Sequence, residues 1–134
     1  MLLKGKRIFL TEDNLTNRSV IQLLLERDGA VFAFERWGFD TLERLQKFVP
    51  VDIILLDLML PNGITGLDLY DQIRTLPAFN QVPIVAVSAK DPGIAIPEVQ
   101  AKGFNGFIAK PINRLRFAQQ VAWAIEGKSV WAAD

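Results

Sequence analysis

The sequence predicts a single α/β domain, built as a doubly wound, five-stranded parallel sheet with helices on both faces. The first observation is the apolar run between Pro50 and Pro61, whose isoleucine and leucine residues are typical of a strand buried on both faces. The second is that strand-like runs alternate five times with segments of helical spacing. Since such strand–helix–strand connections are right-handed, the alternation gives a parallel sheet covered on both sides.

The run between Pro50 and Pro61 is the third strand, and Asp57 lies where this strand leaves the sheet. The other four expected strands are Lys6–Leu10, Ala30–Phe34, Pro83–Ser88 and Gly106–Ala109. Helical spacing of apolar side chains predicts helices over residues 14–28, 39–48, 67–76 and 114–126. Asp13 or Asn14 can cap the first helix, and Asn113 can cap the last.

Residues 90–102 are less regular, because Pro92, Gly93 and Pro97 interrupt them. A residue before proline is biased away from helix, which applies to Ile96. We therefore expect a loop to about Ile96, followed by a short helix with Pro97 near its first turn.

The connections are mostly too short to hold a further domain, and there is no internal repeat or low-complexity linker. We expect one domain over residues 1–127, followed by a short tail over 128–134, with no output domain. A chain of 134 residues is long enough for one substantial core.

Composition excludes several classes of function. Lys+Arg and Asp+Glu balance at 15 each, so no net basic field attracts nucleic acid. Cysteine and histidine are both absent, which rules out disulfides, thiolate metal sites and the commonest general base. No apolar run approaches the ~20 residues of a membrane span, and the start of the chain lacks a signal-peptide pattern. We expect a cytoplasmic protein.

Polar side chains follow four of the five predicted strands. Glu12 and Asp13 follow the first strand, Asp57 the third, Ser88 ends the fourth and Lys110 follows the fifth. Because the carboxyl ends of parallel strands meet at one edge of the sheet, these side chains are expected to border one crevice.

These residue types suit one kind of chemistry. Neighbouring carboxylates repel unless a cation holds them, and all-oxygen ligands suit Mg²⁺. A lysine ammonium can pair with a phosphoryl oxygen, and a serine hydroxyl can donate to the same group. The set therefore favours phosphoryl transfer to a carboxylate, where positioning and charge neutralisation supply the catalysis.

Each member of the set also has a simpler interpretation. Glu12 and Asp13 can be helix caps, Asp57 a turn residue, Ser88 a hydroxyl at a strand end and Lys110 a solvated side chain. Taken singly these alternatives compete well. Their coincidence at successive strand ends favours a functional site.

With these residues, the sequence resembles the receiver domain of two-component response regulators (CheY-like), which has a flavodoxin-like fold. The resemblance covers Lys6 to Gly127. Its motifs are Glu12-Asp13, Asp57 within DLMLP, Gly66 before LDLYDQIR, Ser88-Ala89 and Lys110-Pro111.

The resemblance implies that Asp57 is the phosphorylation site, accepting a phosphoryl group from a histidine kinase or a histidine phosphotransfer protein. It implies that Asp13, Asp57 and the Met59 carbonyl bind Mg²⁺ directly, while Glu12 acts through water.

It also implies that Lys110 pairs with the phosphoryl group and that Ser88 moves to hydrogen-bond it. Phe107 occupies the position of the aromatic switch, although a core-facing aromatic residue in a strand is the alternative. Phosphorylation would then shift a two-state equilibrium that strand five and the last helices report.

Three features depart from the family pattern. The loop between Asp57 and Gly66 is one residue longer than usual, with Asn62-Gly63 as the site of the insertion. The fourth helix is expected to be short or displaced. Met59 and Lys90 stand at the positions that tune loss of the phosphoryl group, and this poor water-orienting pair predicts a long-lived phosphoaspartate.

Three other interpretations compete with the resemblance. A haloacid-dehalogenase-type phosphatase needs a second aspartate at position 59, where the chain has Met59. A flavodoxin-like FMN binder needs a neutral phosphate loop where Glu12 and Asp13 stand. A degenerate receiver acting as a phosphorylation-independent interaction module is the leading alternative. We expect a phosphoacceptor that assists its own phosphorylation and slow dephosphorylation, not an enzyme acting on a separate substrate.

The downstream partner is not encoded in any motif. An exposed apolar patch would mark a partner surface or a homodimer contact, and the candidate residues are Phe104, Phe117, Trp123 and Trp131. We favour the alternative, in which they pack in the core and the tail.

Overall fold

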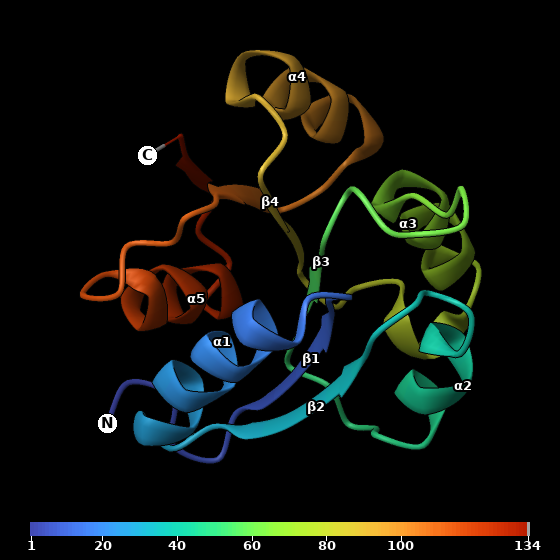
Figure 1. Ribbon diagram of the computed structural model, residues 1–134. Coiled ribbons are helices and arrows are strands. Elements are labelled where there is room, and N and C mark those ends of the chain that lie inside the picture. Colours follow the sequence, from blue (N-terminus) through green and yellow to red (C-terminus); the bar gives the residue numbers. More distant parts are fainter. Residues whose placement is uncertain (134) are drawn as a thin grey trace.

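A parallel sheet forms the centre of the computed structural model, which describes residues 1–133 (Figure 1). Its strands are β1 (Arg7–Thr11), β2 (Val31–Glu35), β3 (Ile53–Leu56), β4 (Ile84–Ser88), β5 (Gly106–Ala109) and β6 (Val130–Ala132). Their order across the sheet is β2-β1-β3-β4-β5-β6, and every pair is parallel. The predicted doubly wound α/β class is confirmed, with six strands in the place of five.

Helices cover both faces of the sheet. They are α1 (Leu15–Arg27), α2 (Thr41–Gln46), α3 (Gly66–Arg74), α4 (Pro92–Lys102) and α5 (Phe117–Ile125), with a 3₁₀ turn η1 at Pro77–Phe79. Buried side chains of α1 and α5 form one core cluster with the sheet, and those of α2, α3 and α4 form the other. The ribbons of these helices surround the sheet in Figure 1. Among the described residues, no helix is long and apolar enough to cross a membrane.

The strands are apolar throughout because both of their faces are covered. All four residues of β3 are fully buried, as the run between the prolines predicted. Asn14 caps α1, and its side-chain oxygen accepts a hydrogen bond from the Asn17 N–H at 2.9 Å.

The prediction for residues 90–102 was wrong. Helix α4 begins at Pro92, where the missing N–H needs no partner, and it continues through Pro97 to Lys102. Ala95 and Val99 are fully buried on its inner face. Burial of this face outweighs the local bias of the residue before Pro97.

The predictions for the last two segments also need correction. Asn113 does not cap α5, which begins four residues later at Phe117, but its carbonyl accepts the Phe117 N–H at 2.9 Å. The expected tail contains β6, so residues 130–132 belong to the sheet. Phe104 and Phe117 are buried, which confirms core packing, while Trp123 and Trp131 are partly buried.

Candidate functional site

Strands β1 and β3 bring the three predicted carboxylates together. The two strands are neighbours, with Thr11 opposite Leu56, so the residues that follow them lie side by side. Carboxylate oxygens of Glu12, Asp13 and Asp57 lie within 4.8 Å of one another. Glu12 and Asp57 are buried, with 1% and 5% of their surface exposed.

Lys110 reaches this cluster from the end of β5. Its ammonium group donates hydrogen bonds to Glu12 Oε1 and, at 2.9 Å, to Asp57 Oδ2. The Lys110 backbone is held by its N–H, which donates to the Ser88 carbonyl at 2.9 Å. One cation therefore bridges two buried carboxylates, and long-range pairing of strands places it there.

Burial and charge act against each other on the pKa values of this pair. Burial lowers the pKa of Lys110, but the charge of Asp57 and the hydrogen bonds to Glu12 and Asp57 outweigh it, so the pKa is raised. Burial raises the pKa of Glu12, and Lys110 opposes this shift only in part. Lys110 thus carries its positive charge at neutral pH.

Two further carboxylate oxygens of the cluster each accept a backbone hydrogen bond. Asp57 Oδ1 accepts the Met59 N–H at 3.1 Å, and Glu12 Oε2 accepts the Asn14 N–H at 3.2 Å. The side chains that could bind a metal ion here offer only carboxylate oxygens, and the chain has no histidine or cysteine. Such a set fits Mg²⁺. The Met59 side chain is half exposed, and the role of its carbonyl as a ligand stays a prediction.

Ser88 lies at the end of β4, next to β3, and is fully buried. Its hydroxyl oxygen accepts the Lys90 N–H at 3.2 Å. Among the described residues it makes no hydrogen bond to Asp57. Ser88 is thus at the edge of the site with its hydroxyl turned toward the loop that leads into α4.

Phe107 is fully buried in β5. It belongs to the core cluster on the α4 side of the sheet, opposite Ala86 of β4 and Trp131 of β6. It therefore lies in the strand next to that of Ser88. Its switch role stays a prediction.

Two features of the site were not singled out from the sequence as structural determinants. A Cβ atom on Gly66 would lie 2.4 Å from the Asp57 carbonyl oxygen, so only glycine lets α3 begin this close to the end of β3. Glu35, at the end of β2, is a fourth buried carboxylate, and its hydrogen bonds hold the loop that leads into α2. Its place at a strand end was the signal that could have found it.

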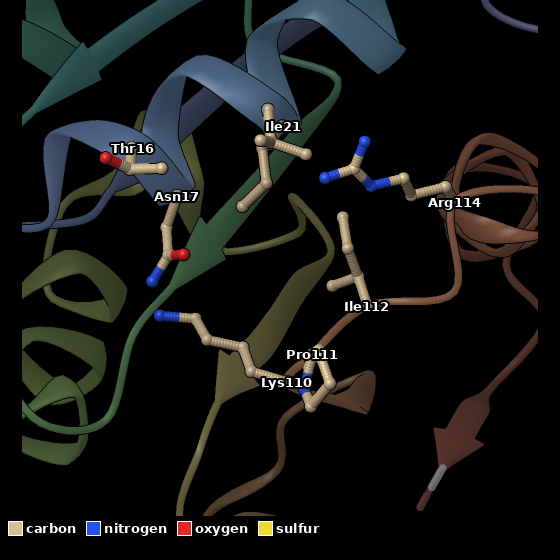
Figure 2. Close-up of a pocket in the computed structure, with 8 residues that line it drawn as sticks. Thr16, Asn17, Ile21, Lys110, Pro111, Ile112 and Arg114 are labelled. Atoms are coloured by element: carbon tan, nitrogen blue, oxygen red, sulfur yellow. The ribbon is translucent and has the colours of Figure 1, made fainter.

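A hollow of about 170 Å³ borders the site between α1 and the segment that follows β5 (Figure 2). Thr16, Asn17 and Ile21 of α1 line one side, and Lys110, Ile112 and Arg114 line the other (Figure 2). Lys110 therefore faces both the carboxylate cluster and a surface depression.

The chain belongs to the response regulator receiver domain family, whose family model matches residues 8–122. The match includes all three carboxylates, Ser88 and Lys110. The protein is therefore a receiver domain of two-component systems, related both to response regulators and to receiver domains of histidine kinases.

Curated relatives are of both kinds. Peroxide stress-activated histidine kinase mak1 of Schizosaccharomyces pombe is 34% identical over 114 residues, 81% of this chain and 7% of that protein. The autoinducer sensor kinase/phosphatase CqsS of Vibrio cholerae is 28% identical over 118 residues, 87% of this chain and 17% of that protein. Polar-differentiation response regulator DivK of Brucella ovis is 27% identical over 116 residues, 87% of this chain and 93% of DivK. The chain thus spans a small part of the kinases it matches.

Solved structures show the same fold. Chemotaxis response regulator CheY4 of Vibrio cholerae superimposes with a TM-score of 0.81 at 20% identity, over 90% of this chain and 99% of that one. The non-phosphorylated HemR receiver domain of Leptospira biflexa gives a TM-score of 0.78 at 25% identity, over 90% of this chain and 94% of that one.

Proposed function

We propose that this receiver domain accepts a phosphoryl group on Asp57 and signals to a partner through the resulting conformational change. The observation that carries the proposal is the buried Asp57 carboxylate, which shares the Lys110 ammonium with Glu12 and has Asp13 beside it. The Lys110 ammonium can also pair with the oxygens of an incoming phosphoryl group. A buried carboxylate with such a cation beside it is suited to become an acyl phosphate.

In the proposed reaction an Asp57 carboxylate oxygen attacks phosphorus, a P–O bond forms and the bond to the donor breaks, most simply the P–N bond of a phosphohistidine. Asp57 Oδ2 already faces Lys110, which can follow the charge onto the phosphoryl oxygens. Glu12, Asp13 and Asp57 would hold Mg²⁺, which supplies charge neutralisation in the transition state.

The product places a group of about −1.5 to −2 charge at the end of β3. Ser88 can turn its hydroxyl from the Lys90 N–H toward a phosphoryl oxygen. This contact exists only in the phosphorylated protein, so it supplies the differential binding that shifts a conformational equilibrium. The protein acts in this proposal as a phosphoacceptor and not as an enzyme on a separate substrate.

We assign the role of phosphodonor to a histidine kinase or a histidine phosphotransfer protein. Two relatives are named as kinases, and the hollow beside Lys110 offers an approach to the site from the α1 side (Figure 2). Leu15, the residue before Thr16 in α1, is 46% exposed and offers such a partner an apolar contact.

The test is to incubate the protein with Mg²⁺ and acetyl phosphate and to measure intact mass. We expect the wild type to gain one phosphoryl group and Asp57→Asn to gain none. Asp52→Asn is the matched control, because Asp52 lies at the opposite end of β3 and its carboxylate accepts the Arg7 N–H at 2.7 Å. It should be phosphorylated like the wild type.

Absence of the mass gain in a protein with an intact fold would contradict the proposal. That result would favour the phosphorylation-independent interaction module. A gain that persists in Asp57→Asn would instead move the acceptor to another carboxylate of the cluster.

A further inference from the structure

Strand β6 has no part in the function proposed above, although it covers an important edge of the sheet. It runs parallel to β5, with Val130 opposite Gly106 and Trp131 opposite Phe107. Figure 1 shows the C-terminal segment beside β5, between α4 and α5. Without it, β5 would be the edge strand, with unpaired backbone N–H and C=O groups.

Gly106 makes this docking feasible. A Cβ atom at position 106 would lie 2.5 Å from the Val130 carbonyl oxygen, far inside the contact distance of carbon and oxygen. Any side chain there would push β6 away from the edge. The glycine has an ordinary φ, so its role is the close approach of β6 and not an unusual backbone conformation.

Strand β6 packs on both faces of the sheet. Val130 is buried in the cluster formed with α1 and α5, while Trp131 packs against the cluster on the α4 side that contains Phe107. Its position therefore depends on the arrangement of Phe107.

The strand is short and lies at the edge of the sheet. It has three residues, all paired with β5, and its first residue, Val130, donates its N–H to the Asn105 carbonyl at 3.4 Å. The segment before it is held by the Lys128 N–H, which donates to the Trp123 carbonyl at 3.0 Å. A three-residue edge strand opens at a lower free energy than the central strands of the sheet.

The register of the strands relates β6 to the end of β4, where Ser88 lies. Trp131 lies opposite Phe107, Phe107 opposite Ala86, and Ala86 lies two residues before Ser88 in β4. A shift of Ser88 toward a phosphoryl group changes the packing at the end of β4. Phe107 and then Trp131 are the neighbours that must adjust.

We propose that β6 is an autoinhibitory strand, which covers the β5 edge in the unphosphorylated protein and is released when Asp57 is phosphorylated. This proposal rests on the proposed phosphorylation of Asp57. Release uncovers an edge with free backbone hydrogen-bonding groups beside Phe107. Such an edge fits an extended segment of a partner protein, added as a strand in the place of β6.

The first measurement is hydrogen–deuterium exchange of the 128–133 segment in the full chain, without phosphodonor, comparing wild type and Gly106→Ala. We expect Gly106→Ala to exchange at least about tenfold faster in this segment while β1, β3 and β4 stay protected. Gly93→Ala is the matched control, because a Cβ there meets only Asp91 Oδ2, at 3.4 Å. Trp131→Ala is the second releasing variant, used if Gly106→Ala fails to fold.

The second measurement repeats the exchange on wild type whose phosphorylation has been verified by intact mass. Exchange of 128–133 should rise to near the Gly106→Ala level. If phosphorylation favours release of β6, then release of β6 must favour phosphorylation. Gly106→Ala should therefore be phosphorylated more readily than Gly93→Ala, because its β6 is already released.

The outcomes separate the two proposals. A phosphorylated protein whose 128–133 segment exchanges as slowly as before overturns the autoinhibitory strand and leaves the phosphoacceptor function intact. A folded protein that gains no phosphoryl group overturns the proposed function and the coupling together. In a third outcome, the amides of β6 exchange no faster than those of the central strands, in the wild type and in both releasing variants. This result would show that β6 is a fixed part of the core and would overturn the autoinhibitory strand.

Discussion

Glu35 and Glu12 are buried carboxylates at the ends of neighbouring strands, and the protein satisfies them in opposite ways. Glu35 accepts hydrogen bonds from the backbone N–H groups of Trp37, Gly38 and Asp40, at 2.5, 2.7 and 3.3 Å, and from the Thr41 hydroxyl at 2.8 Å. Glu12 accepts one backbone N–H and the ammonium of Lys110, which it shares with Asp57.

The donors to Glu35 all lie within residues 37–41, so breaking their bonds means unfolding the β2–α2 loop. Lys110 follows β5 and reaches Glu12 with a flexible side chain. Its ammonium group can therefore move toward negative charge that arrives at Asp57 while the backbone stays in place. A carboxylate whose hydrogen bonds all come from its own loop has a structural role. A carboxylate that shares a lysine ammonium with a neighbour can lose this contact to another anion. Predictions for variants of Glu35, Lys110 and Glu12 test this difference, and a last one, for Met59, concerns the same site.

The largest effect is expected for Glu35→Ala, which leaves four donors in the β2–α2 loop without their buried acceptor. We expect the free energy of unfolding to fall by about 4 kcal/mol. Urea denaturation measures it, with Glu43→Ala as control, because Glu43 is exposed and its pair with Lys47 contributes about 0.5 kcal/mol or less. An equal loss in the two variants would mean that Glu35 does not hold the loop.

Lys110→Met should have the next largest effect, because it leaves Glu12 and Asp57 buried without their shared cation. The free energy of unfolding should fall by about 3 kcal/mol in EDTA. Excess Mg²⁺ should restore most of this loss, since it replaces the missing charge, whereas it should not rescue Glu35→Ala. If Mg²⁺ fails to rescue Lys110→Met, the cluster is not a cation site. Lys47→Met, at an exposed position, is the control.

Glu12→Gln should change unfolding by less than about 1 kcal/mol in EDTA, because burial already disfavours the charged form of this side chain. At a Mg²⁺ concentration 100 times the Kd, the wild type should gain about 2.7 kcal/mol. The variant should gain clearly less at the same concentration.

The pH dependence of Glu12→Gln follows from the raised pKa of Glu12. The folded wild type binds this proton more tightly than the unfolded chain, so in EDTA the wild type gains stability relative to the variant as pH falls toward 4.5, the ordinary value. Melting curves between neutral pH and this value measure the difference. A difference that runs the other way would show that Glu12 is held as a favourable anion.

The smallest effect concerns loss of the phosphoryl group. The Met59 side chain is half exposed, and the Lys90 ammonium is paired with Glu98 of α4 at 2.6 Å, so neither offers a group that orients water at Asp57. Met59→Asn should shorten the lifetime of the phosphoaspartate roughly tenfold, a small part of what a positioned polar group contributes. Decay of the phosphorylated mass measures it. Rapid decay in the wild type would contradict the predicted long lifetime.

The doubly wound fold and the gathering of Glu12, Asp13 and Asp57 could be predicted because both follow from local pattern and from the rule that parallel strands end at one edge. The full extent of α4 could not. Its apolar residues are too few to outweigh two prolines in the sequence, and only the burial of Ala95 and Val99 against the sheet decides in favour of helix.

Strand β6 escaped prediction for a different reason. Three residues carry no periodicity, and the condition for their docking lies in another strand, at Gly106. The double contact of Lys110 is also long-range, since β5 brings a side chain to residues 98 and 53 positions away. Sequence pattern located these residues at strand ends, and the tertiary structure determined their partners.

The loop between Asp57 and Gly66 offers a practical use. Its base is closed by the Gly66 N–H, which donates to the Leu58 carbonyl at 3.1 Å, and by the bridge between Met59 and Thr65. Asn62 and Gly63 at its tip are exposed and adopt positive φ values, and a Cβ on Gly63 would meet nothing within 4 Å. A fluorophore attached at this tip would lie a few residues from Asp57 without touching the base of the loop. The tip is therefore a suitable position for an optical reporter of the state of the domain.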